Sequence, residues 1–129
     1  MQEIIKMSQQ VLEPSGRVRR LGLAANGSRY LALSEDDVVQ WDVLQYEYGP
    51  AWPDHAGLPA RFPTKAHIFH SCLRGVIGGP VGADGPGRTL AQCLSHNSCG
   101  RVLFSSTKLR HVRENLRALG AHVAADADH

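Results

Sequence analysis

The clearest pattern of apolar and polar positions lies in the last third of the chain, from Arg101 to Asp126. The apolar run at 101–106 predicts a strand, and Ser106 then predicts the cap of a helix that starts at Thr107. Gly120 is typical of a helix end, and residues 122–125 predict a second short strand. One stripe of the predicted helix, which should pack on the sheet, carries apolar residues at spacings of three, four and three: Leu109, Val112, Leu116 and Leu119.

Three apolar runs near the amino terminus predict strands at residues 17–24, 29–34 and 38–44. Asn26-Gly27 separates the first two runs and favours a type I′ hairpin turn, because both central residues of that turn have positive φ. Glu35-Asp36-Asp37 predicts the next turn. In the third run apolar and polar residues alternate as in a half-buried strand. The pattern therefore predicts an antiparallel meander over residues 17–44.

This meander resembles one blade of a WD-repeat propeller. Its sequence is VRRLGLAANGSRYLALSEDDVVQWDV, with an Asn-Gly turn, a Leu-Ala strand, an acidic turn and a terminal Trp41-Asp42. The resemblance covers about a fifth of the chain, and no period of about 40 residues recurs, although a propeller needs several blades. It therefore implies only that the three strands are sequential neighbours.

The middle of the chain has weaker patterns. Residues 45–64 predict a long loop with four prolines, whose aromatic residues form either a binding rim or an anchor to the body of the protein. Residues 66–72 predict a strand, residues 73–77 are compatible with strand or helix, and residues 90–96 predict a short helix. We therefore expect a single α+β domain over residues 1–129, in which a meander precedes strand–helix units packed on one face of the sheet.

Composition changes this picture little. The net charge of +2 is too small to indicate nucleic-acid binding by itself, and no apolar run is long enough to cross a membrane. The start MQEIIKMSQQ has no export pattern, so three cysteines predict reduced thiols in the cytoplasm. Frequent alanine, glycine and arginine with rare lysine is compatible with a GC-rich bacterial source.

Positive charge is concentrated in the second half of the chain. Residues 1–64 hold six Lys/Arg and eight Asp/Glu, whereas residues 65–129 hold eight and four. On the last predicted helix, a basic face opposes one acid, Glu114. This face predicts a partner surface for a phosphate backbone or an acidic protein, and the alternative is a solvated face that aids solubility. Its residues are Lys108, Arg110, Arg113 and Arg117.

A glycine-rich loop at residues 78–87 precedes Arg88 and Thr89. Exposed backbone N–H groups before a helix suit an anion or phosphate. The loop lacks both the phosphate-loop ending and the dinucleotide-binding spacing, so an ordinary surface loop is the alternative. The predicted ligand-binding residues combine this loop with the aromatic one: Arg88, Thr89, Tyr48 and Trp52.

Cysteines and histidines form a third candidate. Thiolate and imidazole groups bind zinc, and the set that could converge is His70, Cys72, Cys93 and His96. No C-x-x-C pair supports a zinc site, so buried cysteines and surface histidines are the alternative, and we predict no cofactor. A cysteine nucleophile (Cys72, Cys93 or Cys99) beside a histidine, with Asp54 or Asp84 orienting it, is a further alternative, but no cysteine stands out.

Because no convincing catalytic set emerges, we predict a non-enzymatic binding or regulatory protein that acts through a protein or nucleic-acid partner and is compatible with a homodimer. The expected contact surfaces are the aromatic loop and the basic helix face. The alternative is a small enzyme or an anion-binding protein that uses the 78–89 loop with nearby cysteines and histidines. The sequence does not indicate which reaction or ligand this would be.

Overall fold

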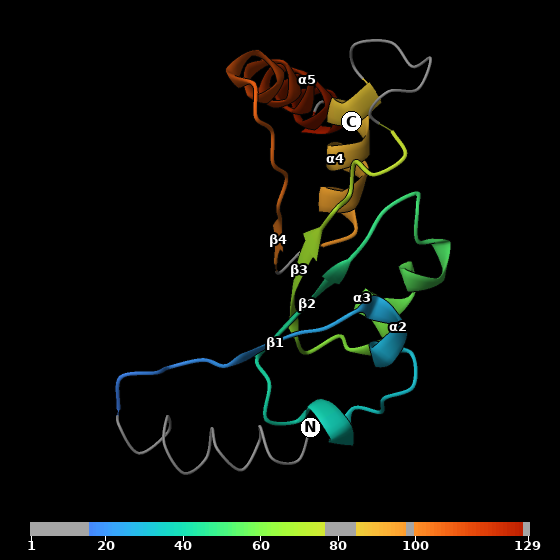
Figure 1. Ribbon diagram of the computed structural model, residues 1–129, viewed down its shortest axis with the longest axis vertical. Helices are drawn as coiled ribbons and strands as arrows, with labels where there is room; N and C mark the ends of the chain where they lie inside the picture. Colours follow the sequence, from blue (N-terminus) through green and yellow to red (C-terminus); the bar gives the residue numbers. More distant parts are fainter. Residues whose placement is uncertain (1–15, 77–84, 98–99, 128–129) are drawn as a thin grey trace.

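A computed structural model describes residues 16–76, 85–97 and 100–127, the last six of them by their backbone alone. Four strands form one sheet in the order β1-β2-β3-β4, and all three pairings are parallel (Figure 1). Val43 pairs with Gly22 on one side and with Ala66 on the other. The strands are β1 Gly22–Ala24, β2 Val43–Glu47, β3 Ala66–His70 and β4 Arg101–Val102.

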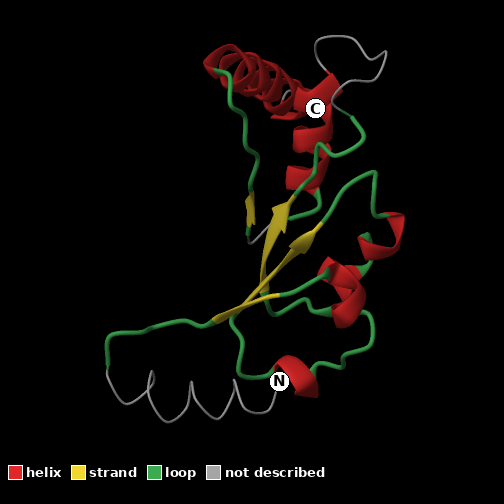
Figure 2. Ribbon diagram, in the orientation of Figure 1, coloured by secondary structure: helices red, strands yellow, loops and turns green. Residues whose placement is uncertain are grey.

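Helical segments connect the strands, as parallel neighbours require. The connecting segments are α2 Gly27–Tyr30, η2 Asp36–Val38, η3 Pro53–His55, α3 Leu58–Arg61 and α4 Gly85–Ser95, where η denotes a 3-10 helix, and α5 Leu109–Ala127 follows β4. Figure 2 shows the short helices between β1 and β3 gathered on one side of the sheet. When sequential parallel strands are joined by crossovers of the same handedness, the connections lie on the same face of the sheet. The described part of the chain therefore has an α/β architecture.

The predicted antiparallel meander over residues 17–44, and with it the α+β class, is wrong. Asn26-Gly27 begins α2 rather than a hairpin turn. Tyr30 holds this helix against the sheet, because its hydroxyl donates to the Leu23 carbonyl at 2.6 Å and lies 3.2 Å from the Gln45 carbonyl oxygen. The fully buried tyrosine thus stabilises a crossover where the local pattern predicts a return strand.

Gly27 has a packing role that the hairpin prediction missed. A Cβ at this position would overlap the imidazole of His55. The Gly27 N–H donates to the carboxylate of Glu47 at 2.8 Å, and His55 donates from Nδ1 to the Glu47 carbonyl at 2.7 Å. The glycine is therefore required for close approach, and its contacts join α2, η3 and the end of β2.

The third predicted strand, residues 38–44, is mostly not a strand. Residues 36–38 form η2, and extended pairing begins only at Val43. Val39, predicted to face the core, has 66% of its surface exposed, whereas Trp41 is buried as predicted. Val38 is fully buried instead. Val38 and Trp41 are three residues apart, which is one turn of a 3-10 helix, so both face the core. An alternating pattern this short does not distinguish the two conformations.

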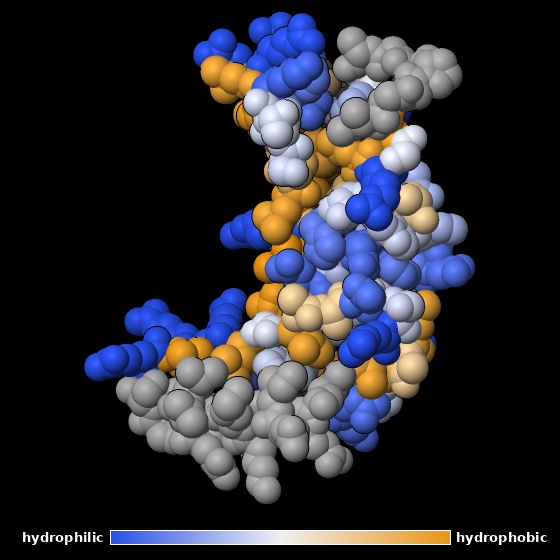
Figure 3. All heavy atoms as spheres, viewed as in Figure 1, coloured by the Kyte–Doolittle hydropathy of each residue, from blue (hydrophilic) through white to orange (hydrophobic). Residues whose placement is uncertain are grey.

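The two faces of the sheet differ in environment. On the face that is turned toward the helices, the side chains of β2 and β3 are buried: Leu44, Tyr46, His67 and Phe69. The residues that alternate with them along β2 and β3 point to the opposite face, where four are only half-buried: Gln45, Glu47, Ile68 and His70. Figure 3 shows apolar residues gathered along the side of the molecule that carries β3 and β4. The buried core cluster comprises Tyr30, Val38, Trp41, Leu44, Tyr46, Tyr48, Leu58, Phe62, Phe69, Cys72, Leu73, Leu90 and Cys93.

A hydrogen-bonded pair of polar side chains lies within this core. Nε2 of His67 donates to the Phe62 carbonyl at 2.9 Å, which leaves Nδ1 to accept from the Tyr46 hydroxyl at 2.8 Å. Burial lowers the pKa of His67 and raises the pKa of Tyr46, because the charged form of each would lose its hydration. Both groups are therefore satisfied in their neutral forms.

The last predicted helix is confirmed, but its end and its packing differ from the prediction. The Lys108 N–H donates to Ser106 Oγ at 3.2 Å just before α5. The helix continues through Gly120 to Ala127, so the predicted strand at 122–125 is wrong. Gly87 of α4 lets Ala118 and Leu119 of α5 approach closely, since a Cβ there would overlap them. This contact with α4 offsets the roughly 1 kcal/mol cost of a glycine within a helix.

The predicted apolar stripe of α5 is only partly buried. Leu119 packs against the core, but Leu109 and Leu116 have 63% and 53% of their surface exposed. The helix rests on α4 rather than directly on the sheet (Figure 1). The predicted strand at 101–106 shortens to β4, and Ser106 lies in the connection to α5.

The middle of the chain agrees better with prediction. The strand predicted at 66–72 is β3, and the helix predicted at 90–96 lies in α4, which begins earlier, at Gly85. Residues 72–76 form turns, and the predicted 45–64 loop contains the end of β2, η3 and α3. Residues 2–7, 78–84 and Cys99 lie outside the described residues. Among the described helices, none has the length and apolar character needed to span a membrane.

Candidate functional site

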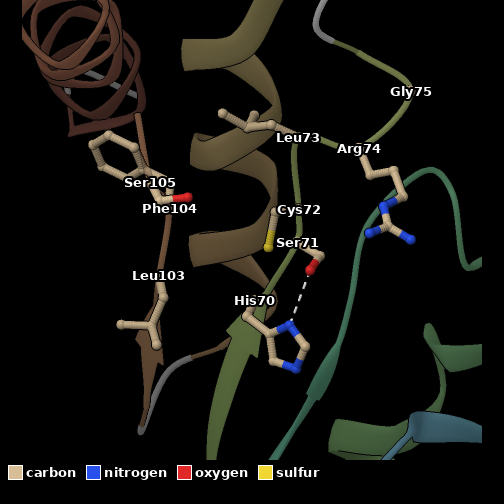
Figure 4. A pocket seen from close by; sticks show the side chains of 9 residues that line it. All are labelled: His70, Ser71, Cys72, Leu73, Arg74, Gly75, Leu103, Phe104 and Ser105. Carbon is tan, nitrogen blue, oxygen red and sulfur yellow. Dashed lines mark hydrogen bonds between the residues drawn. The ribbon is translucent and has the colours of Figure 1, made fainter. Parts of the chain in front are cut away.

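A cavity of about 650 Å³ lies at the carboxyl ends of β3 and β4, and we call it the strand-end cavity. In sheets of parallel strands this edge is where ligands commonly bind. Figure 4 shows its wall from the end of β3 facing the segment that follows β4. The lining residues are His70, Ser71, Cys72, Leu73, Arg74, Gly75, Leu103, Phe104 and Ser105.

The polar part of the cavity is formed by His70 and Ser71. His70 Nδ1 lies 3.0 Å from Ser71 Oγ, within hydrogen-bond distance (Figure 4). Ser71 has φ of 57°, and among the described residues no other non-glycine residue has positive φ. Such a conformation is unfavourable for a side chain with a Cβ and is frequent at functional sites. It places the hydroxyl of Ser71 directly at the end of β3.

Glu47 lies beside His70 on the half-buried face of the sheet. The two residues are register partners of β2 and β3, so their side chains point the same way. Partial burial raises the pKa of Glu47, but it is outweighed by hydrogen bonds from the backbone N–H groups of Gly27 and of Glu47 itself, with smaller contributions from the charges of His70 and His55. The net pKa therefore lies below the usual value, and a negative charge is held next to His70 at neutral pH.

The apolar part of the cavity comes from Leu73, Leu103 and Phe104. Leu73 is buried, whereas Leu103 is 47% exposed, and both line the cavity. The Leu103 N–H donates to the Phe69 carbonyl at 2.8 Å, which continues the parallel pairing beyond β4. The cavity therefore combines an apolar wall with hydroxyl and imidazole groups, an arrangement typical of small-molecule sites.

Asn97 fixes the position of the wall that follows β4. Its Nδ2 donates to the His67 carbonyl at 2.7 Å and to the Arg101 carbonyl at 3.1 Å. Gly100 passes so close to the His67 carbonyl that a Cβ would overlap it. These contacts tie the start of β4 to β3, the two strands whose carboxyl ends carry the strand-end cavity.

Cys72 and Cys93 form a buried pair of free thiols between β3 and α4. The Cys72 thiol donates a hydrogen bond to Cys93, which together with burial raises the pKa of Cys72. Accepting this bond lowers the pKa of Cys93, although burial opposes the effect. The thiol nearest to the strand-end cavity is thus held in its protonated form.

A smaller cavity of about 140 Å³ lies behind this pair, on the helix side of the sheet. Tyr48 forms one wall, stacks on Phe69 with ring centroids 3.8 Å apart, and places its hydroxyl 3.0 Å from His96 Nδ1. Three predicted ligand-binding residues, Tyr48, Trp52 and Thr89, line this cavity together. The fourth, Arg88, is exposed on α4 and is not among the lining residues.

The predicted zinc-binding residues do not converge. Cys72 and Cys93 contact each other, but His70 bonds to Ser71 and His96 bonds to Tyr48. Within residues 16–76, 85–97 and 100–127, no three histidine, cysteine, aspartate or glutamate side chains are grouped as metal ligands. Asp54 lies on η3, and Asp84 is outside the described residues.

The predicted partner surface is exposed along α5. All four of its residues, Lys108, Arg110, Arg113 and Arg117, are solvent-accessible. The exposed Leu109 and Leu116 belong to the same helix. The basic face therefore includes two exposed leucines, although the sequence predicted that both would be buried against the sheet.

Three residues of the candidate site were not predicted from the sequence: Glu47, Ser71 and Leu103. A serine that directly follows a histidine at the end of a predicted strand was visible in the sequence. The partner Glu47 was not visible, because its position depends on β2 running parallel to β3 in one register. Comparison with protein-family models, curated proteins and solved structures finds no match to this chain.

Proposed function

We propose that this protein binds a small amphiphilic molecule in the strand-end cavity. The observation that carries this proposal is the juxtaposition of His70 and Ser71, in strained backbone, with an apolar wall around a cavity of about 650 Å³. Cavities of roughly 300–1,000 Å³ with a few polar groups are typical of ligand sites. The ligand's apolar part would lie against Leu103 and Phe104, and its hydrogen-bonding group would lie at His70 and Ser71.

Phenylacetamide is a suitable probe, because it joins an aromatic ring to a neutral hydrogen-bonding amide. In an NMR titration we expect amide shifts confined to residues 70–75 and 103–105. Leu103→Ser should weaken binding about five- to tenfold, since the exposed leucine supplies apolar contact worth about 1 kcal/mol. Val39→Ser, at an exposed position of η2's C-cap, is the matched control and should leave the affinity unchanged. Shifts elsewhere, or equal loss in both variants, would contradict the proposal.

A second candidate function is docking of an acidic protein segment on α5. It is supported by Leu109 and Leu116, which remain exposed beside Arg113 and Arg117. Solvated leucines within a basic face favour an amphipathic acidic partner over a phosphate backbone, which offers no apolar surface. This surface is independent of the strand-end cavity.

A synthetic helical peptide with leucine and glutamate on opposite faces tests this surface. Arg113→Glu with Arg117→Glu should weaken its binding at least tenfold at low salt, because two attractive charges become repulsive. Arg19→Glu with Arg20→Glu is the control, since both arginines are exposed and the net charge changes equally. If fluorescence anisotropy gives the same loss for both pairs, only the net charge matters and the α5 surface is wrong.

We also propose that the protein functions in the reducing cytoplasm. The support is the low cysteine content, since three cysteines in 129 residues are fewer than the disulfide framework of a small secreted domain requires.

A further inference from the structure

We propose that Ser71 is a nucleophile that takes the acyl group of small carboxylic esters bound in the strand-end cavity. This inference rests on the proposed ligand-binding function and assigns a reaction to the same site. It also names the chemical class of the ligand. A carboxylic ester is amphiphilic, because it combines an apolar acyl chain with a polar carbonyl group.

The backbone presents the Ser71 hydroxyl at the point where a reacting carbonyl can approach. Ser71 follows the last residue of β3, and its φ of 57° turns the chain sharply there. A strained turn at the carboxyl end of a parallel strand is one way in which a fold exposes a nucleophilic serine. The strained residue is itself part of the cavity wall, because Ser71 lines the cavity.

His70 supplies the base. Its Nδ1 lies 3.0 Å from Ser71 Oγ, which is within the distance needed to accept the hydroxyl proton. Glu47 lies next to His70 on the same face of the sheet and is held ionised by its hydrogen bond from Gly27. Its negative charge would stabilise the imidazolium formed when His70 accepts the proton.

The neighbouring thiol is not the nucleophile. Cys72 also lines the cavity, but its thiol donates a hydrogen bond to Cys93, and this hydrogen bond together with burial raises the pKa of Cys72. The thiolate is the reactive form of cysteine, so a thiol held protonated reacts slowly. Ser71, which has a base within hydrogen-bond distance, is therefore the better placed group.

The reaction proceeds in two balanced steps. Ser71 Oγ bonds to the ester carbonyl carbon, its proton passes to His70 Nδ1, and the carbon–oxygen bond to the alcohol breaks as the alkoxy oxygen takes that proton. Water then gives a proton to His70 and its oxygen to the acyl carbon. The Ser71–acyl bond breaks, Oγ recovers the proton, and a carboxylic acid leaves. Neither step requires an oxidant or a reductant.

The cavity walls indicate which esters fit. Leu73, Leu103 and Phe104 offer apolar contact for a short acyl chain or a phenyl group. A volume of about 650 Å³ accommodates a small ester. We therefore expect esters of short acyl groups, such as p-nitrophenyl butyrate, to react.

Labelling with a short alkyl fluorophosphonate tests Ser71 directly, because this reagent bonds covalently to activated serines. Intact mass and peptide mapping should show a single adduct on Ser71. His70→Gln should slow labelling at least about 100-fold, the usual range for loss of a general base. Ser95→Ala, at an exposed serine of α4, should label like the parent protein.

Two variants separate loss of the nucleophile from loss of the fold. Ser71→Ala removes the hydroxyl but keeps a Cβ at positive φ, whereas Ser71→Gly removes the hydroxyl and relieves the strain. Both should abolish the adduct and the release of p-nitrophenol from p-nitrophenyl butyrate. Ser71→Gly should unfold no more easily than the parent protein.

The outcomes distinguish this inference from the function on which it rests. If no adduct forms while phenylacetamide still shifts residues 70–75, ligand binding stands and the nucleophile is overturned. If neither labelling nor binding occurs, both proposals fall. An adduct on Ser105 or Cys72 instead of Ser71 would also overturn the assignment.

Discussion

Phe69→Ala is expected to lower the free energy of unfolding by about 3–5 kcal/mol, the usual cost of removing a buried phenyl ring. Phe69 is fully buried at the centre of the sheet. Its ring stacks on Tyr48 at 3.8 Å and lies 5.6 Å from the ring of Tyr46. The substitution therefore removes contacts with both aromatic neighbours and leaves a cavity beneath the strand that carries His70.

Urea denaturation measures this loss. Val39→Ala is the control, because Val39 is 66% exposed and a surface substitution usually changes stability by less than about 0.5 kcal/mol. If Phe69→Ala cost no more than Val39→Ala, the side chains of β2 and β3 would not pack as described. The parallel register that brings Glu47 next to His70 would then lose its main support.

Gly100→Ala is expected to be the second most damaging substitution, with a loss of about 3 kcal/mol, at the upper end of the range for overpacking. The added Cβ would overlap the carbonyl oxygen of His67 and the side-chain amide of Asn97. One of these is main chain of β3, so the strain is not relieved by turning a flexible side chain. The start of β4 must move away from β3.

This movement should also affect the strand-end cavity, since Leu103, Phe104 and Ser105 follow β4 directly. We expect weaker phenylacetamide binding in NMR titrations together with a lower urea midpoint. Gly57→Ala is the matched control, because its Cβ would meet no heavy atom within 4 Å and its φ of −85° suits alanine. Equal stability of the two variants would show that β4 does not pass this close to β3.

In the candidate site, the parallel sheet brings together residues that are far apart in the sequence. Glu47, His70 and Ser71 come from two strands separated by a crossover, and Leu103 comes from the segment after a third. Because parallel strands end at the same edge, residues that are far apart in sequence meet there without a long functional loop. The strained backbone at Ser71 and the close packing at Gly27 both lie at this edge of the sheet.

Much of the local structure could be predicted from the sequence. The runs at 66–72 and 90–96 correspond to β3 and α4, and the three- and four-residue spacing from Leu109 onward corresponds to α5. Of these elements, α5 is long enough for hydrophobic periodicity to separate helix from strand, whereas the runs at 66–72 and 90–96 are as short as the run at 38–44 that was assigned wrongly. The predicted helix end was wrong because α5 continues through Gly120 to Ala127, and a glycine inside a helix costs only about 1 kcal/mol.

By itself, the sequence determined where β3, α4 and α5 form, which aromatic residues are available for a core, and that basic residues gather near the carboxyl terminus. Tertiary structure alone decided the direction of the strands. Asn26-Gly27 suits a hairpin turn or a helix start equally well, and the buried Tyr30 hydroxyl with its two carbonyl contacts selects the helix. That choice makes the sheet parallel, and only a parallel register places Glu47 beside His70. Local conformational preferences differ by a fraction of a kcal/mol, whereas burial of one large side chain contributes several times more, so packing determines the topology.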